Sequence, residues 1–298
     1  PRQLDDDTAG SGSLATRLDP AALGHVLRRL GRSPEAPWLH AEIARRMADK
    51  LQLVLRQPGT VIDWWSTLGG GAALLAQAYP KARRVLVEPD TAWAERARER
   101  LRSPWWSARR WSSAPALVVE EGDDVPGGAG LVWANMMLHA VADPAALIGR
   151  WQRLLRADGF VMFSCLGPGT MRELRALYER SGWAQPMSGY VDMHDYGDML
   201  VRAGFADPVM DQEVLTLSWS TPQALLDDLR ALGGNLAPGR HAGLRTPRWR
   251  DRLVHELATL ADADGVLRMS IEVAYGHAFQ GAPRVQPGEA TSISLEDM

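Results

Sequence analysis

The sequence predicts an α/β protein built on a doubly wound, mostly parallel sheet. Between residues 60 and 166, short apolar runs of strand length alternate with amphipathic stretches of helix length. This alternation is typical of a parallel sheet with helices on both faces. Two later runs, residues 209–219 and 268–279, alternate apolar and polar side chains as antiparallel strands do. We therefore expect an antiparallel hairpin at the C-terminal end of the sheet.

Five apolar runs account for the parallel strands. They are "TVIDWW" at 60–65, "RRVLVE" at 83–88, "APALVVEE" at 114–121, "AGLVWANMML" at 129–138 and "GFVMFSCL" at 159–166. The helices expected between them cover 70–79, 91–102 and 144–156, where apolar residues recur at helical spacing. Two further helices are predicted after the last of these strands, at 169–182 and 193–205.

The remaining segments surround this core. Residues 14–58 are predicted to form an N-terminal helical segment, because apolar residues recur at helical spacing on either side of the loop "GRSPEAPW". The main domain is expected over 59–283, with a helical insertion at about 221–264. Residues 1–13 and 284–298 lack apolar periodicity and are expected to be mobile tails.

Composition excludes several classes of protein. The formal net charge of -3 is spread over mixed acidic and basic residues, which argues against a protein that coats nucleic acid. No apolar run approaches the roughly 20 residues that cross a membrane. The acidic, Gly/Ser-rich start does not look like a signal peptide, so we expect a cytoplasmic protein with neither nucleic acid nor membrane as a partner.

Cysteine and histidine offer no metal site. Cys165 is the single cysteine, which excludes an intrachain disulfide and a cysteine-based zinc cluster, and its apolar surroundings indicate packing. His194 with Asp195 and Asp198 has a spacing that suits a helix start, and no third ligand is evident. No metal is therefore expected.

Acidic residues and glycines gather where the first two strands end. Asp63 lies near the end of the first strand, Gly69, Gly70 and Gly71 open the next helix, and Glu88 closes the second strand. Glycines allow close backbone approach to a ligand, and a carboxylate about 20 residues further on can bind ribose hydroxyls. This pattern indicates an adenosine-type ligand.

The downstream half carries a more specific likeness. Three segments resemble class I S-adenosylmethionine-dependent methyltransferases, and specifically the malonyl-acyl-carrier-protein O-methyltransferases of biotin synthesis: "LVWANMMLHAVADPAALIGRWQRLLRADGFVMFSCLGPGTMRELRALY" (131–178), "VDMHDYGDMLVRAGFADPVMDQEVLTLSWSTPQALLDDLRALGGN" (191–235) and "IEVAYGHAF" (271–279). "RRLGRSPEAPWLHAEIARRM" (28–47) is similar to that family's helical lid. The resemblance covers roughly residues 25–280.

This resemblance implies a fold, a cofactor and a reaction. Residues 14–58 would be the helical lid and 59–283 a Rossmann-like methyltransferase domain. The cofactor would be S-adenosylmethionine, and the methyl group would pass to the free carboxylate of a malonyl thioester in biotin biosynthesis. The partner would be an acyl carrier protein bearing the malonyl group, or malonyl-CoA, with a monomer as the working expectation.

The chain departs from the family where the cofactor should bind. Family members carry a D-x-G-x-G-x-G run after the first strand. Aligned on Asp63, this chain has Trp65 and Thr67 at the first two glycine positions and keeps Gly69. A side chain there excludes close backbone approach and disfavours positive φ. Trp65 is consequently either core packing or a stacking surface for the cofactor.

The region after the third strand also departs from the family pattern. The family has a carboxylate that meets the adenine amine, for which Asp123 is the candidate and Asp124 the alternative. The Phe-Asp pair that the family places before the fourth strand is replaced by Ala129 and Gly130.

The resemblance also suggests roles on the acceptor side. Asn135 and His139 would face the methyl group, Asn135 touching the cofactor as well, and Trp38 would belong to the closing lid. Methyl transfer to an ionised carboxylate requires no general base, so positioning should dominate. A guanidinium suits a carboxylate, and Arg172 and Arg175 are the candidates.

These features give three functional hypotheses. The first is the active methyltransferase. The second is a catalytically degenerate homologue that serves as a binding or scaffold protein. The third, nicotinamide-dependent oxidoreduction, is disfavoured because "STLGGG" lacks the G-x-G-x-x-G spacing. A basic stretch at residues 240–252 is either a solvated helix face or a docking face for an acidic carrier protein.

Overall fold

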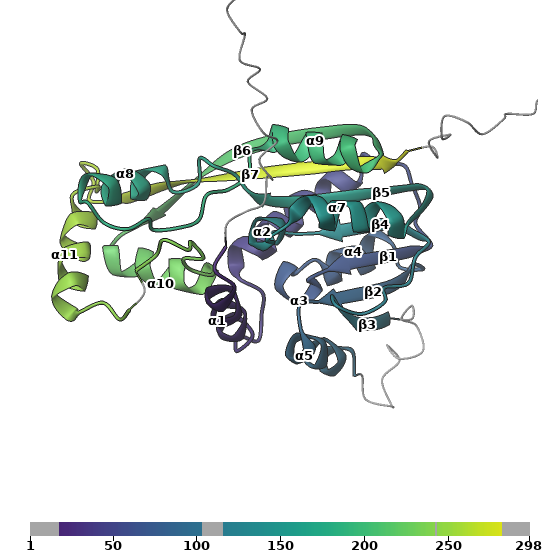
Figure 1. The fold of residues 1–298 in the computed structure, drawn as a ribbon, viewed down its shortest axis with the longest axis horizontal. Coiled ribbons are helices and arrows are strands. Elements are labelled where there is room, and N and C mark those ends of the chain that lie inside the picture. The colour runs from purple at the N-terminus through teal and green to yellow at the C-terminus, as the bar shows by residue number, and fades with distance from the viewer. Residues whose placement is uncertain (1–17, 103–115, 242, 282–298) are drawn as a thin grey trace, which may run out of the picture.

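A seven-stranded sheet forms the centre of the protein. The structure is a computed structural model that describes residues 18–102, 116–241 and 243–281, and the expected tails, 1–13 and 284–298, lie outside these ranges. The sheet has the order β3-β2-β1-β4-β5-β7-β6 (Figure 1). Its strands are β1 Thr60–Trp64, β2 Arg83–Glu88, β3 Ala116–Glu120, β4 Ala129–Ala134, β5 Leu155–Leu166, β6 Phe205–Trp219 and β7 Leu267–Gln280.

Strand directions confirm the predicted fold class. β1 to β5 pair in parallel, whereas β7 is antiparallel to both of its neighbours, β5 and β6. The sheet is therefore mostly parallel and ends in an antiparallel hairpin. β6 begins at Phe205, earlier than the run 209–219 predicted, because a register shift between Ala206 and Val209 lets pairing with β7 continue past the break in alternation.

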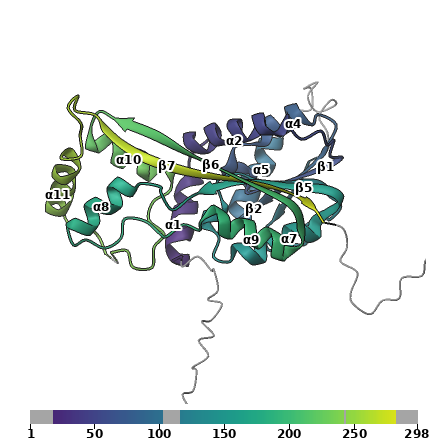
Figure 2. The ribbon, with the colours of Figure 1, turned by 90° about the horizontal axis from the view of Figure 1, so that it is seen from above.

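Helices cover both faces of this sheet. They are α1 Pro20–Leu30, α2 Trp38–Leu51, α3 Ser66–Gly69, α4 Ala72–Ala78, α5 Thr91–Leu101, α7 Pro144–Leu154, α8 Arg172–Arg180, α9 Met193–Ala203, α10 Pro222–Leu232 and α11 Pro247–Ala258, with a 3₁₀ turn, η1, at Leu138–Ala140. Figure 2 shows α2 and α4 on one face and α7 and α9 on the other. α8, α10 and α11 surround the far ends of β6 and β7, with α10 and α11 between these strands in sequence (Figure 1).

Local sequence signals explain where the helices begin. Side-chain oxygens of residues just before the helices accept hydrogen bonds from first-turn N–H groups, as N-caps do. The residues that cap in this way include Asp19, Asp90, Asp143, Asp192 and Thr221. Proline then occupies the first turn of α1, α7, α10 and α11, where its missing N–H costs nothing.

The core divides between the two faces of the sheet. Alternation along β1 sends Val61 into the cluster shared with α2 and α4, and Ile62 and Trp64 into the cluster shared with α7 and α9. In the second cluster Trp151 is fully buried and packs edge-on against Trp64, with ring centroids 5.9 Å apart. Burial on both faces explains why the parallel strands read as continuous apolar runs.

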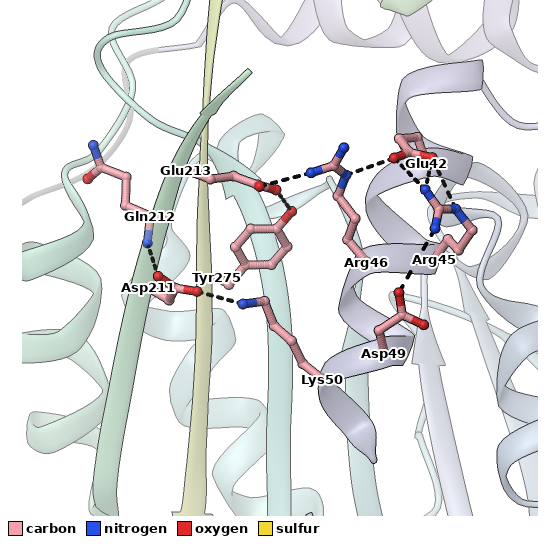
Figure 3. Close-up of polar contacts among 9 residues, drawn as sticks. All are labelled: Glu42, Arg45, Arg46, Asp49, Lys50, Asp211, Gln212, Glu213 and Tyr275. Carbon is pink, nitrogen blue, oxygen red and sulfur yellow. Dashed lines mark hydrogen bonds and ion pairs between the residues drawn. The ribbon is translucent and has the colours of Figure 1, made fainter. Parts of the chain in front are cut away.

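Helix α2 is integrated with the rest of the fold. Ile43, Ala44 and Met47 are fully buried against the sheet. On its outer side, Arg46 and Lys50 form ion pairs of 3.0 and 2.6 Å with Glu213 and Asp211 of β6 (Figure 3). Half-exposed pairs of this kind contribute little stability, about 0–1 kcal/mol each, so the buried face dominates the attachment of α2.

We expect Trp151→Ala to lower the free energy of unfolding by about 3–5 kcal/mol, because a large buried side chain is removed and its contacts with Trp64 and Phe163 are lost. Urea denaturation followed by circular dichroism measures this change. Trp38→Ala is the matched control: Trp38 is 43% exposed, and its truncation should cost much less. Equal losses in the two variants would contradict the assignment of Trp151 to the core.

Candidate functional site

Three polar residues meet at one edge of the sheet. β1, β2 and β4 run in parallel, so their carboxyl ends come together. Asp63 lies in β1, Glu88 ends β2 and Asn135 follows β4. Their exposed fractions are only 3%, 0% and 0%. Three polar side chains buried this deeply require internal partners.

The turn after β1 holds a non-glycine residue in a conformation that favours glycine. Trp65 adopts a left-handed conformation, φ 51 and ψ 47, and the short helix α3 follows before Gly70 at φ 70. A left-handed non-glycine residue costs roughly 1–2 kcal/mol, so its surroundings must hold it in place. The Trp65 backbone N–H donates to the Val87 carbonyl at 2.7 Å, which ties the turn to β2.

One carboxylate holds both Trp64, the last residue of β1, and Trp65, the first residue of the turn. The indole N–H groups of Trp64 and Trp65 donate to the two oxygens of Glu121, each at 2.9 Å. Arg150 donates to the Glu121 carbonyl, and its guanidinium lies 5.1 Å from the centre of the Trp64 ring. The indoles are thus packed inside the protein, with their polar atoms satisfied.

Glu88 is engaged by the same turn. Its Oε1 accepts a hydrogen bond of 3.0 Å from the Thr67 backbone N–H and one of 2.7 Å from the Thr67 hydroxyl. Its Oε2 is buried and has no hydrogen-bond partner among the residues that the structure describes. Burial raises the pKa of Glu88 to about 8, against the opposing effect of the two Thr67 hydrogen bonds.

Asp63 is similarly enclosed. The Ser66 hydroxyl donates to Asp63 Oδ2 at 2.5 Å, and Oδ1 is buried without a partner within the described ranges. Burial raises the pKa of Asp63 to about 7, and the Ser66 hydrogen bond acts in the opposite direction. Two neighbouring carboxyl groups are therefore dry, and each has one oxygen still able to accept a donor.

Asn135 connects α2, α3 and β5. Its Nδ2 donates to the carbonyls of His40 and Gly69 at 2.8 and 2.6 Å. Its Oδ1 accepts a hydrogen bond of 2.7 Å from the Ser164 hydroxyl. Both ends of the Asn135 amide are therefore used within the protein.

The glycines serve close packing at this edge. A Cβ on Gly69 would lie 3.2 Å from the Asn135 carbonyl oxygen, and one on Gly71 would lie 2.6 Å from Trp133 Nε1. Gly70 needs its positive φ to end α3. In this conformation the three glycines make contacts with the protein's own chain.

Two histidines flank the turn, and both are neutral at pH 7. His40 is 5% exposed and donates from Nδ1 to the Leu68 carbonyl at 3.1 Å, and burial lowers its pKa to about 4. His139 Nδ1 accepts from the Leu166 N–H at 3.3 Å, and burial lowers its pKa to about 3. The His139 ring packs edge-on against Tyr190, 5.7 Å between centroids.

A cavity of about 140 Å³ lies beside the turn. Its wall is mostly aliphatic and comes from α1, α2, α8 and the segment after α10, and Trp65, Leu68 and Met136 also contribute. His40, His139 and Tyr190 are among its polar lining groups. Within the described part of the chain, Asp63 and Glu88 do not line it.

The candidate arginines differ in their surroundings. The Arg172 side chain is 70% exposed and pairs with Glu173 at 3.3 Å. Arg175 is half-buried, donates to the Ser188 carbonyl at 3.3 Å and lies 5.5 Å from the centre of the Tyr190 ring. Ser188 and Tyr190 both line the cavity. Arg175 is therefore adjacent to the cavity wall.

The other predicted site residues lie further out. Trp38 is the first residue of α2 and is 43% exposed. Asp123 is exposed just after β3, and its carbonyl accepts a hydrogen bond of 2.7 Å from Arg150. In the basic stretch, Arg245 stacks on Trp249 at 4.1 Å and Arg252 on Trp183 at 5.4 Å. Two of the five arginines in that stretch are thus already in contact with aromatic rings.

Across the ranges that the structure describes, no group of three His, Cys, Asp or Glu side chains could hold a metal ion, and no helix is long and apolar enough to cross a membrane. Cys165 is buried, which raises the pKa of its thiol to about 12 and keeps it unreactive.

Sequence reasoning missed several residues that shape this site. The sequence indicates Thr67 only as a lost glycine, yet it supplies both donors to Glu88. Glu121, which holds both indoles, and Ser164, which orients Asn135, were not singled out. The one available signal was that two adjacent tryptophans at a buried strand end need an acceptor.

The strand order and the edge geometry define a class of protein. A sheet in this order with an antiparallel seventh strand has the Rossmann-like fold of class I methyltransferases. A Bacillus halodurans protein provisionally assigned as a methyltransferase shares it, with a TM-score of 0.53 and 14% identity over 80% of this chain and 100% of that chain. The YcgJ protein of Bacillus subtilis matches with a TM-score of 0.53 and 9% identity, covering 80% of this chain and 99% of that one.

Sequence comparison gives the family. No family model matches the chain. The malonyl-[acyl-carrier protein] O-methyltransferase of Gallionella capsiferriformans is 36% identical over 93% of this chain and 96% of its own length. That of Laribacter hongkongensis is 36% identical, over 84% of this chain and 85% of its own. That of Nitrosospira multiformis is 34% identical, over 88% and 90%. The chain belongs to the malonyl-[acyl-carrier protein] O-methyltransferase family.

The buried carboxyls predict a pH-dependent stability. Because the pKa values of Asp63 and Glu88 are raised to about 7 and 8, the native state binds more protons than the unfolded state between about pH 5 and 7. The free energy of unfolding should therefore fall as the pH rises, by about 1.4 kcal/mol per pH unit for each group.

Glu88→Gln should remove about half of this dependence, since the amide keeps an acceptor for Thr67 but does not titrate. Urea denaturation of both proteins at several pH values between 5 and 7 measures the slopes. Equal slopes for the variant and the parent would show that Glu88 titrates normally.

Proposed function

We propose that the protein is an S-adenosylmethionine-dependent O-methyltransferase that acts on the free carboxylate of a malonyl group carried by an acyl carrier protein in biotin biosynthesis. Family membership carries this proposal: relatives with that name are 36% identical over as much as 96% of their own length. The match to the Gallionella relative covers 93% of this chain. We place this activity in the cytoplasm.

The chemistry proposed for the acceptor requires no base. A malonyl carboxylate is ionised near neutral pH and is already a nucleophile. The low pKa values of His40 and His139 leave both imidazoles neutral, so they can shape the cavity without adding charge. The mainly aliphatic wall would exclude water from the attacking oxygen, which favours positioning as the main source of rate.

Arg175 is the proposed anchor for the carboxylate. A charged group beside an aliphatic cavity needs a counter-charge, and a guanidinium can bind both carboxylate oxygens. Arg175 lies next to the cavity residues Ser188 and Tyr190, and its Nε has no partner in the described part of the protein. Arg172 is already paired with Glu173 in solvent.

The free carboxyl oxygens of this site suit the proposed cofactor, but Glu88 is closed off in this conformation. The free oxygens of Asp63 and Glu88 are suited to ligand hydroxyls. However, Glu88 is 0% exposed, its other oxygen is occupied by Thr67, and it does not line the cavity. Glu88 is therefore not accessible to a hydroxyl group of the cofactor in this conformation.

This arrangement also favours a second candidate, a homologue that retains the family's partner and has lost methyl transfer. The observation behind it is the replacement of two motif glycines by Trp65 and Thr67, both of which make buried contacts. The two candidates differ in whether a product forms.

The activity is tested with the purified protein, S-adenosylmethionine and malonyl-loaded carrier protein, and methyl ester formation is followed by mass spectrometry. We expect a product on malonyl carrier protein and none on a carrier protein whose malonyl group is already esterified. Absence of product under conditions in which the Gallionella relative is active would favour the second candidate.

Arg175→Ala should raise the KM for malonyl carrier protein roughly tenfold to a hundredfold, because a charge-assisted hydrogen bond is lost. Arg172→Ala, one turn away on the same helix, is the matched control and should change KM little. Steady-state kinetics of the two variants decides the assignment, and a larger effect at Arg172 would reverse it.

A further inference from the structure

We infer that the α3 turn, residues 65–70, is an internal competitor of the cofactor's ribose, with Thr67 occupying the carboxylate of Glu88. This inference rests on the proposed function for the identity of the ligand. It concerns how a nucleoside with a free ribose diol reaches Glu88. It makes Thr67 a residue that determines cofactor affinity in this particular chain.

Thr67 offers Glu88 the chemistry that a ribose would offer. A ribose diol presents two O–H donors to a carboxylate. Thr67 presents two donors as well, its backbone N–H at 3.0 Å and its hydroxyl at 2.7 Å, both to Oε1. The Glu88 side chain in this contact is fully buried. A diol cannot bind Oε1 until Thr67 leaves.

The internal match is incomplete, which makes exchange feasible. Glu88 Oε2 remains buried without a partner in the described ranges, as does Asp63 Oδ1. A buried carboxyl oxygen without a hydrogen-bond partner is costly whether or not the group is ionised. A diol that spans both carboxylate oxygens would satisfy Oε2 as well, so a ligand gains something that Thr67 does not provide.

The turn is anchored along its length and would have to move as a unit. Consecutive residues from Trp65 to Gly69 each make a buried contact outside α3: Trp65 with Val87 and Glu121, Ser66 with Asp63, Thr67 with Glu88, Leu68 with His40, and Gly69 with Asn135. Trp65 and Leu68 also form part of the cavity wall. The closed turn therefore competes with the ligand, and the free-energy cost of opening it lowers the apparent affinity.

Equilibrium titration with S-adenosylhomocysteine tests this directly. We expect Thr67→Gly to bind at least tenfold more tightly than the parent protein, because the hydroxyl is lost and the backbone is freed. Thr67→Ser keeps both donors and should bind like the parent. Trp65→Gly combined with Thr67→Gly restores the family's glycine spacing and should bind at least as tightly as Thr67→Gly. Thr67→Ala, which also loses the hydroxyl and, like glycine, keeps the backbone N–H, covers the case in which the glycine variant does not fold.

A second titration locates the site. In the tighter-binding variant, adenosine should bind and 2′,3′-dideoxyadenosine should not, because only the former carries the diol. Adding Glu88→Gln to that variant should weaken adenosine binding while thermal unfolding remains cooperative. Equal binding of the two nucleosides would place the ligand elsewhere and overturn the inference.

The outcomes separate this inference from the proposed function. Equal affinities for the parent, Thr67→Ser and Thr67→Gly proteins would refute competition by Thr67, whether or not methyl ester is formed. No binding by any variant would refute it as well. Tighter binding by Thr67→Gly without methyl ester formation would uphold the competition and reject the methyltransferase.

Discussion

The buried carboxylate of Glu88 is the constraint on which the centre of this structure depends. A carboxyl group with no solvent exposure must find donors inside the protein, and the two that reach it both belong to Thr67. Thr67 in turn fixes α3, whose carbonyls at Leu68 and Gly69 accept from His40 and Asn135. The position of α2 over the sheet is thereby linked to an interaction at the end of β2.

The two tryptophans are compatible with this edge because a single acceptor serves both. An indole buried without a partner for its N–H loses stability, and Glu121 accepts from Trp64 and Trp65 at equal distances of 2.9 Å. Trp65 also adopts a left-handed backbone conformation that a glycine would adopt more easily. The hydrogen bonds to Glu121 and the buried packing of the two rings oppose that local cost. The turn is therefore stable with tryptophan at position 65.

The fold could be predicted because the spacing of apolar residues and the length of apolar runs are properties of the local sequence. Continuous apolar runs gave the parallel strands, and alternation at 209–219 and 268–279 gave the hairpin that β6 and β7 form. The short helix α3 was not predicted, since its four residues carry no periodicity and its geometry depends on distant partners. Asp63 and Glu88 could be placed at this edge of the sheet because they lie at the ends of predicted strands. Thr67, Glu121 and Ser164 could not be placed there, because their hydrogen-bond partners lie 21 to 57 residues away in the sequence.

Family membership and local geometry answer different questions about this protein. Identity spread over most of the chain establishes the family, and a change at two positions barely alters it. Cofactor affinity depends instead on the free-energy difference between the turn as observed and a turn withdrawn from Glu88. A ligand that binds only the withdrawn form has its affinity reduced by the fraction of molecules in that form. A chain can therefore keep the family's fold while its affinity for the cofactor is set by the stability of a six-residue turn, residues 65–70.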